Sequence, residues 1–202
     1  MFTGIVVSIG TVTKQPVAGG DMRIAVTCPP GSLGPVDVGG SVSVSGVCLT
    51  ALAPRADGFE ADVSAETLSL TTLGERSDGG RVNLEPAATL STALGGHLVS
   101  GHVDGVGRLV ERQDDARSER MRFEVPAGLA RYIAVKGSVC VDGVSLTVNA
   151  VDGSAFEVNL VPHTLTVTTL GGLGPGDRVN IEVDQVARYL ERLIECRAAP
   201  AG

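Results

Sequence analysis

The chain repeats itself at a spacing of 97 residues, and this repeat limits its fold more than any other feature. The segment Gly46-Val47-Cys48-Leu49-Thr50 returns as Gly143-Val144-Ser145-Leu146-Thr147. Other segments keep the same offset, namely 71–74 with 168–171, 82–85 with 179–182, Gly4 with Gly101 and Gly10 with Gly107. A single long period indicates a duplicated domain rather than a solenoid of many units. We therefore predict two copies of one module, followed by a tail.

Each copy is built from short segments rich in β-branched residues and separated by glycine-rich corners, a pattern typical of strands. The first copy has expected strands at 2–13, 21–28, 41–53 (two strands hinged at Gly46), 59–63 and 81–85. The second has them at 101–111, 120–125, 138–141, 144–151 and 156–160. Many short strands within fewer than 100 residues predict a small closed Greek-key barrel, which leaves no exposed sheet edge. The fold class is all-β.

Three helices are expected beside the strands. Ser64 is placed to cap a short helix running toward Leu70, and Pro162 opens the equivalent helix of the second copy. In the tail, Asp184 can cap a helix that carries an apolar stripe on one face. That stripe consists of Val186, Leu190, Leu193 and Ile194. It can pack on its own barrel or form an oligomer seam, and the pattern alone favours neither.

Composition narrows the function classes. A net charge of −7 and an aromatic content of 3% argue against a nucleic-acid surface. No apolar run is long enough to cross a bilayer and no signal peptide is recognised, so we expect a cytoplasmic protein without a membrane partner. The four cysteines show no CxxC spacing, which predicts free thiols rather than a zinc site or a disulfide framework. The mixed charges of 111–122 are expected to form a solvated hairpin rather than a partner site.

The positions at which the two copies differ indicate where chemistry has been added. At the offset of 97, Cys48 aligns with Ser145, His102 with Ile5, and Lys136 with Gly39. The other unequal pairs are Asp62 with Asn159, Ser64 with Val161, and Glu66 with His163, whereas Thr50 matches Thr147 and Thr67 matches Thr164. Matching threonines beside unequal ionisable groups suggest two pockets that bind similar molecules and treat them differently.

Each of these residues also has a structural explanation. A lone cysteine in an apolar strand is most often a small buried hydrophobic residue, and Lys136 at a turn is by default a solvated amine. His97 and His102 lack an accompanying carboxylate or thiol at ligand spacing, which argues against a metal site. The sequence contains no Walker motif, no dinucleotide-binding glycine motif and no nucleophile elbow.

Several motifs, taken in order, resemble the riboflavin synthase family. They are Met1-Phe2-Thr3-Gly4-Ile5-Val6, the segment 46–50, the segment 95–105 (GGHLVSGHVDG), Lys136-Gly137-Ser138 and the segment 142–148. The resemblance runs from Met1 to about Arg192 and implies two tandem six-stranded Greek-key barrels with a C-terminal helix that holds a homotrimer. The expected domains are 1–97 and 98–184, two lumazine-binding barrels, and 185–202, the trimerisation helix and tail.

The resemblance also implies an activity, the dismutation of two molecules of 6,7-dimethyl-8-ribityllumazine. One donates a four-carbon unit to the other, giving riboflavin and 5-amino-6-ribitylamino-uracil in the last step of riboflavin biosynthesis, with no cofactor or metal. In the family the reacting pair lies between the N-terminal barrel of one chain and the C-terminal barrel of the next, and lumazine synthase is a candidate partner. The alternative is a non-catalytic relative that binds lumazine or flavin as a fluorescent antenna. A barrel that binds other macromolecules has little support.

Site residues carried over from the family fall into two expected pockets. The N-barrel pocket would use Gly4, Ile5, Val6, Cys48, Leu49, Thr50, Asp62, Val63, Ser64, Ala65, Glu66 and Thr67. The C-barrel pocket would use Gly101, His102, Val103, Lys136, Ser145, Leu146, Thr147, Val161, Pro162, His163, Thr164, Leu165 and Thr166.

Four of the expected site residues are candidates for catalysis. His102 is the candidate for proton transfer, because an imidazole titrates near neutral pH. Cys48, Ser41 or a bound water would supply the nucleophile, with Ser145 assisting. The chain departs from the family at Ser45, where asparagine is common, and at Ala65, where proline is common; both residues suit a turn or a cap.

Overall fold

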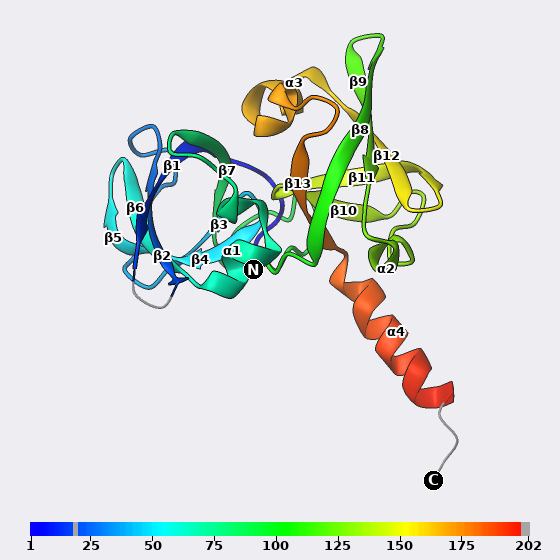
Figure 1. The fold of residues 1–202 in the computed structure, drawn as a ribbon, viewed down its shortest axis with the longest axis horizontal. Helices are drawn as coiled ribbons and strands as arrows, with labels where there is room; N and C mark the ends of the chain where they lie inside the picture. Colours follow the sequence, from blue (N-terminus) through cyan, green and yellow to red (C-terminus); the bar gives the residue numbers. More distant parts are fainter. Residues whose placement is uncertain (18–19, 199–202) are drawn as a thin grey trace.

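The computed structural model describes residues 1–17 and 20–198 and contains two strand-rich modules, followed by a helix that projects from the second (Figure 1). The first module comprises β1 (Ser8–Pro16), β2 (Met22–Thr27), β3 (Ser41–Val44), β4 (Val47–Thr50), β5 (Leu52–Arg55), β6 (Gly58–Val63), α1 (Ala65–Leu70), the 3-10 helix η2 (Thr72–Gly74) and β7 (Gly80–Pro86). The second comprises β8 (Gly105–Asp115), β9 (Ser118–Glu124), α2 (Ala127–Ala130), β10 (Ser138–Val141), β11 (Val144–Asp152), β12 (Ala155–Leu160), α3 (Pro162–Val167), η3 (Thr169–Gly172) and β13 (Arg178–Val183). The helix α4 (Gln185–Ala198) follows.

The second module is a closed six-stranded barrel in the order β10-β11-β12-β9-β8-β13. The first has the order β4-β3-β7-β1-β2-β6-β5, in which the two outermost strands are consecutive in the chain. Strands β4 and β5 together occupy the place of β11, and the break between them comes at Ala51. Ala53 beyond it has a left-handed backbone (φ 44°), and the register with β6 shifts between Leu52 and Arg55. The prediction of an all-β fold with two similar barrels is confirmed.

Each module has its own apolar core, built from the inward-facing residues of its strands. Phe59 anchors the first core, and the stacked rings of Phe123 and Phe156, with centroids 5.6 Å apart, anchor the second. A third, small cluster of Phe2, Val99 and Cys140 lies apart from both cores. Because alternate residues of a strand face opposite sides, these cores determine which side chains are left for a site.

The strands expected at 2–13 and 101–111 both begin later than predicted. β1 starts at Ser8 and β8 at Gly105, and of the residues before them only Phe2 and Val99 pair, in an isolated bridge. Gly4 and Gly101 have left-handed backbones, with φ of 75° and 79°, which turn the chain out of the strand direction. A sequence of β-branched residues predicts extended chain here but does not reveal where it docks.

The helix ends follow their capping residues. Ser64 Oγ accepts a hydrogen bond from Thr67 N at 3.2 Å, Pro162 occupies the first turn of α3, and Asp184 Oδ1 accepts from Val186 N at 3.0 Å. The expected hairpin at 111–122 forms from β8 and β9. The short helices α2, η2 and η3 were not predicted, because segments of three or four residues carry almost no periodicity.

The apolar stripe of α4 is exposed along its length. Its members Val186, Leu190, Leu193 and Ile194 are each at least 56% exposed, and the neighbouring Tyr189 is 70% exposed. Figure 1 shows α4 extending away from the second barrel. None of the helices in the described ranges is long and apolar enough to cross a membrane.

Candidate functional site

Two segments cross between the modules and build the candidate site. Ser145 N donates to the carbonyl oxygen of Gly4 at 2.8 Å, and Cys48 N donates to the carbonyl oxygen of Gly101 at 2.8 Å. A side chain at either glycine would collide with its partner, since an added Cβ would lie 2.5 Å from Ser145 Cβ or 2.6 Å from Cys48 Cβ. The start of the first module is therefore docked on β11 of the second, and the start of the second module on β4 of the first.

The apolar residues that follow these glycines also contact the opposite module. Val6 packs against the core of the second module, and Val103 packs against the core of the first. Leu68 of α1 also packs against the first core, and Leu165 of α3 against the second.

Two glutamates hold the crossing segments in place. Glu85 accepts hydrogen bonds from Thr3 N, Thr3 Oγ1 and Gly4 N at 2.7 to 2.9 Å. Glu182 makes the equivalent bonds to Ser100 N, Ser100 Oγ and Gly101 N at 2.6 to 2.9 Å. Burial raises the pKa of both carboxyls, and these donors partly oppose the shift.

This geometry corrects the grouping of the expected pockets. Residues 4–6 were assigned to the N-barrel pocket but lie against Ser145 of the second module. Residues 101–103 were assigned to the C-barrel pocket but lie against Cys48 of the first. The offset of 97 matches equivalent residues in the two copies, and it cannot show that equivalent segments have exchanged modules.

We define the N half-site as the outward face of β4 with the segment 101–103, Ser41, Asp62 and residues 64–67 at α1. Along β4 the burial alternates, so that Cys48 is half-buried, Leu49 is in the core and Thr50 is exposed. Ser41 of β3 is the register partner of Thr50. The N half-site therefore presents a thiol and two hydroxyls on one face.

We define the C half-site as the outward face of β11 with the segment 4–6, Lys136, His97 and residues 161–166 at α3. Ser145 is half-buried, Leu146 is in the core and Thr147 is exposed, repeating the pattern of β4. The thiol of one half-site is thus replaced by a hydroxyl in the other.

Three expected site residues direct their side chains into the barrel cores. Leu49, Val63 and Leu146 are at most 9% exposed and belong to the barrel cores. By contrast, exposed side chains surround both half-sites, and they are Ile5, Thr50, Asp62, Ser64, Ala65, Glu66, His102, Lys136, Thr147, Val161, Pro162, His163 and Thr166. Thr67, Val103, Thr164 and Leu165 are half-buried.

His97 belongs to the C half-site, a position that its sequence spacing to His102 does not indicate. Its Nδ1 lies 2.7 Å from Ser145 Oγ. Burial lowers the pKa of His97, so the ring is neutral at pH 7 and one ring nitrogen is free to accept a proton. A hydroxyl in hydrogen-bond contact with a neutral imidazole is the arrangement that activates a nucleophile or orients it. Comparison of the two copies could not reveal the contact between His97 and Ser145, because His97 lies in the segment that joins the copies and has no equivalent at the offset of 97.

Two charged residues of the half-sites, Asp62 and Lys136, have different surroundings. Asp62 accepts a bidentate pair of hydrogen bonds from Arg23 at 2.6 and 2.9 Å, and this contact lowers the pKa of Asp62. Lys136 is exposed and has a left-handed backbone with φ of 66°, at the place where the first copy has Gly39 with φ of 84°. A lysine in a left-handed conformation, where glycine would be less strained, points to a role for its amine.

His102 is exposed beside Gly101, and its backbone N–H donates to Glu182 Oε2 at 3.1 Å. It follows Gly101, whose carbonyl accepts from Cys48 N, and it lines a surface pocket together with Gln185 and Tyr189 of α4. Across residues 1–17 and 20–198, no three His, Cys, Asp or Glu side chains gather as metal ligands.

Comparisons with known proteins give one consistent family. The lumazine binding domain model matches residues 3–87 and again residues 100–184. The riboflavin synthase of Mycobacterium bovis is 48% identical over 200 residues, which cover 96% of this chain and 98% of that protein. The riboflavin synthase of Photobacterium phosphoreum is 44% identical over 194 residues, covering 96% and 89%. A crystal structure of LumP complexed with riboflavin superposes with a TM-score of 0.81 and 27% identity, covering 91% of this chain and 99% of that one.

Proposed function

The chain belongs to the riboflavin synthase family, enzymes that transfer a four-carbon unit, and we propose that it converts two molecules of 6,7-dimethyl-8-ribityllumazine into riboflavin and 5-amino-6-ribitylamino-uracil. The observation that carries this proposal is the pair of equivalent but chemically unequal half-sites. A reaction between two copies of one substrate needs two similar binding sites that treat their occupants differently. Cys48 with His102 in one half-site and Ser145 with His97 in the other meet that need.

The proposed binding contacts follow from the two outward faces. Thr50 and Thr147 offer hydroxyls, and neighbouring backbone groups of β4, β11, α1 and α3 can read the polar edge and the ribityl chain of a lumazine. Val103 and Val6 supply apolar walls. Holding two lumazines face to face replaces a bimolecular encounter, an effect worth up to about 7 to 11 kcal/mol.

The chemical roles are assigned from position. One lumazine must lose a proton from its 7-methyl group, and the other must accept a nucleophile before it can receive the resulting carbanion. We assign proton transfer to His102 and the supply or positioning of a nucleophile to Cys48, Ser41 or a bound water. Ser145 assists, and His97 accepts or directs its hydroxyl proton.

We further propose that the active enzyme is a homotrimer in which the N half-site of one chain faces the C half-site of the next. The exposed apolar stripe of α4 supports this, because contiguous apolar side chains on a helix favour association. The open half-sites support it too, since a second chain would enclose the substrates. The proposed domains are 1–97, 98–184 and 185–202, the proposed location is the cytoplasm, and lumazine synthase is a candidate partner.

The test is to mix purified protein with 6,7-dimethyl-8-ribityllumazine alone and follow both compounds by absorbance. Two lumazines consumed per riboflavin formed, without an added cofactor, is the expected result. Loss of lumazine without riboflavin, or no change in either, contradicts the proposal.

A second candidate function is that of a non-catalytic binder of lumazine or flavin. The likeness to LumP, a protein crystallised with riboflavin, favours it. Purified protein that retains a bound chromophore and shows no turnover would support this alternative.

A further inference from the structure

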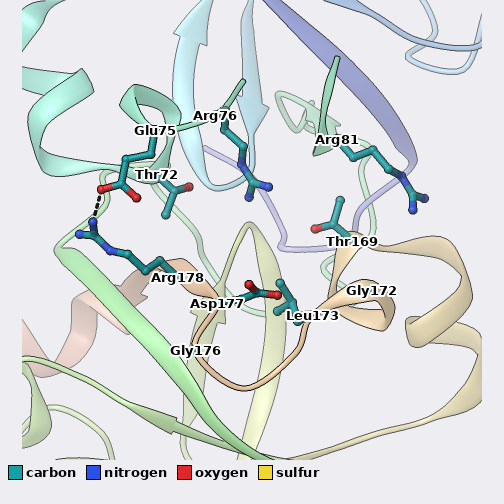
Figure 2. Close-up of a pocket in the computed structure, with 10 residues that line it drawn as sticks. All are labelled: Thr72, Glu75, Arg76, Arg81, Thr169, Gly172, Leu173, Gly176, Asp177 and Arg178. Atoms are coloured by element: carbon teal, nitrogen blue, oxygen red, sulfur yellow. Dashed lines mark hydrogen bonds and ion pairs between the residues drawn. The ribbon is translucent and has the colours of Figure 1, made fainter. Parts of the chain in front are cut away.

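His102 lies against the first turns of α4, in a cavity of about 400 Å³. The cavity is lined by the crossing segment that carries His102 and by Arg188 and Tyr189 of the helix. It differs from the cavity of about 480 Å³ between the two modules, shown in Figure 2, where Arg178 pairs with Glu75. None of the described half-site residues lines the cavity between the modules, whereas the cavity beside α4 contains the candidate for proton transfer.

Asp104, two residues after His102, fixes the end of this crossing segment. Its Oδ2 accepts a hydrogen bond from Val183 N at 2.7 Å, and its Oδ1 accepts from the guanidinium of Arg188. The side chain of Asp104 is only 10% exposed. The start of the segment is held separately, by the carboxylate of Glu182. His102 therefore lies between two anchors, and the second of them depends on α4.

The sequence of the first copy carries no counterpart of this second anchor. At the offset of 97, Asp104 aligns with Val7, an exposed apolar residue. Val183 aligns with Pro86, which has no N–H to donate. No helix follows β7 over residues 88–98, where α4 would have its equivalent. The segment with an imidazole is thus held by carboxylates at both ends, whereas the segment with Ile5 at the equivalent position is held by one only at its start.

Arg188 is itself held in place by the second module. Its guanidinium lies 5.7 Å from the ring centre of Tyr132. The hydroxyl of Tyr132 donates to Glu191, and Arg131 Nε lies 2.9 Å from the other carboxylate oxygen of Glu191. A guanidinium over an aromatic ring is attracted to the face of that ring. The contacts of Arg188 with both Tyr132 and Asp104 therefore limit the conformations that this long side chain can adopt.

We propose that Arg188 is a positioning residue for His102 and acts through Asp104. A group that transfers a proton must be held within about 0.5 Å of its productive geometry, and anchors on both sides of His102 restrict the backbone that carries it. Arg188 is half exposed, so its ion pair contributes little to overall stability. Its effect falls instead on the orientation of His102. The inference rests on the proposed function, in which His102 transfers the proton.

The test combines one readout that needs no turnover with one that does. The chain contains three histidines, so nuclear magnetic resonance of isotope-labelled imidazoles can resolve each ring, and His102→Gln identifies the resonance of His102. Steady-state kinetics with 6,7-dimethyl-8-ribityllumazine then separates kcat from KM.

The variants remove the anchor from either side. Arg188→Met removes the charge and keeps an unbranched side chain, and Arg188→Lys keeps the charge. Asp104→Asn changes the barrel side of the pair and leaves the apolar stripe of α4 intact, so a loss shared with Arg188→Met does not come from altered association of the helix. Arg192→Met is the matched control, because Arg192 lines the same cavity but pairs with Glu195 at 3.7 Å.

We expect Arg188→Met and Asp104→Asn to shift the His102 resonance and to lower kcat by about tenfold, with KM changed by less than about twofold, because a misplacement of about 1 Å can cost up to about 10²-fold in rate. Arg188→Lys should recover most of the loss. The double variant should be no worse than the poorer single variant, since the two residues act as one pair. Arg192→Met should match the wild-type protein.

An unmoved His102 resonance in Arg188→Met and Asp104→Asn overturns the proposal, and so does a loss of kcat that is equal in Arg188→Met and Arg192→Met. If the resonance moves but the wild-type protein does not turn lumazine over, the anchor stands and the proposed function is refuted instead.

Discussion

Asn83 and Asn180 reach across the boundary between the two modules in opposite directions and make the same pair of hydrogen bonds. Asn83 accepts from Thr169 N at 2.7 Å and donates to the Asp142 carbonyl at 2.8 Å. Asn180 accepts from Thr72 N and donates to the Ser45 carbonyl, both at 2.8 Å. Each side chain is 1% exposed. The two modules are therefore joined by polar groups that water cannot reach.

The first prediction concerns this junction. Asn180→Ala removes two hydrogen bonds and leaves a buried N–H and a buried carbonyl unpaired, which should lower the free energy of unfolding by about 2 to 4 kcal/mol. Urea denaturation followed by circular dichroism measures the change. Asn159→Ala, on the exposed face of β12, is the control and should change stability by less than about 0.5 kcal/mol. Equal effects of the two substitutions would contradict a structural role for the hydrogen bonds between the modules.

The second prediction is a pH dependence at Asp142. Burial raises the pKa of this carboxyl from 3.8 to about 6, and Arg76 only partly opposes the shift. The unfolded chain ionises Asp142 at lower pH than the folded chain does, so its contribution to stability is present below about pH 4 and is lost as the pH rises through 6. Such a shift corresponds to roughly 3 kcal/mol.

Asp142→Asn removes this titration. The free energy of unfolding of wild type minus that of the variant should therefore fall between about pH 4 and pH 7. Taking the difference cancels the contributions of Glu85 and Glu182, whose pKa values are also raised. A difference that stays flat with pH would show that Asp142 does not titrate in this range.

The third prediction separates stability from activity at Lys136. Lys136→Gly relieves a left-handed backbone and should raise the free energy of unfolding by about 1 kcal/mol, while removing the amine raises KM for lumazine. Ala116→Gly is the control, because Ala116 has φ of 56° in the β8–β9 turn, far in sequence from the site residues. It should gain stability without a change in KM. A Lys136→Gly enzyme with unchanged kinetics would remove the lysine from the site.

The fourth prediction tests the nucleophile. Cys48→Ala should retain its oligomeric state and lose most lumazine turnover, whereas Cys196→Ala, at an exposed thiol of α4, should remain fully active. Absorbance assays and size-exclusion chromatography report both properties. Full turnover by Cys48→Ala would assign the nucleophile to another group, with Ser41 the next to substitute.

The fifth prediction tests His97 through its contact with Ser145. His97→Asn should reduce kcat by about 10²-fold or more, the range typical of general base groups, with little loss of lumazine binding. Ser145→Ala, and the double variant with His97→Asn, complete a cycle. If the two residues act together, the double variant should be no worse than the poorer single variant. Independent, multiplicative losses would show that the hydrogen bond does not serve catalysis.

The sequence predicted most of the architecture, because strand periodicity and the offset of 97 are local or pairwise signals. Ser64, Pro162 and Asp184 marked their helices correctly, since capping depends on the nearest few residues. The crossing of residues 4–6 and 101–103 was missed because equivalence between copies does not specify which module a segment contacts. The hydrogen bonds of Thr72 N and Thr169 N to Asn180 and Asn83 were equally hidden, since only the packing of the two modules shows them.

The exchange of segments between the modules also bears on how such a gene can recombine. A crossover that replaced the codons for 1–97 with those of a relative would import Cys48 and α1, yet the new N half-site would still receive His102 from the resident half. The imported Ile5 and Val6 would meanwhile line the resident C half-site. Both sites would become hybrids, so neither half of this gene can be inherited alone without altering the other's pocket.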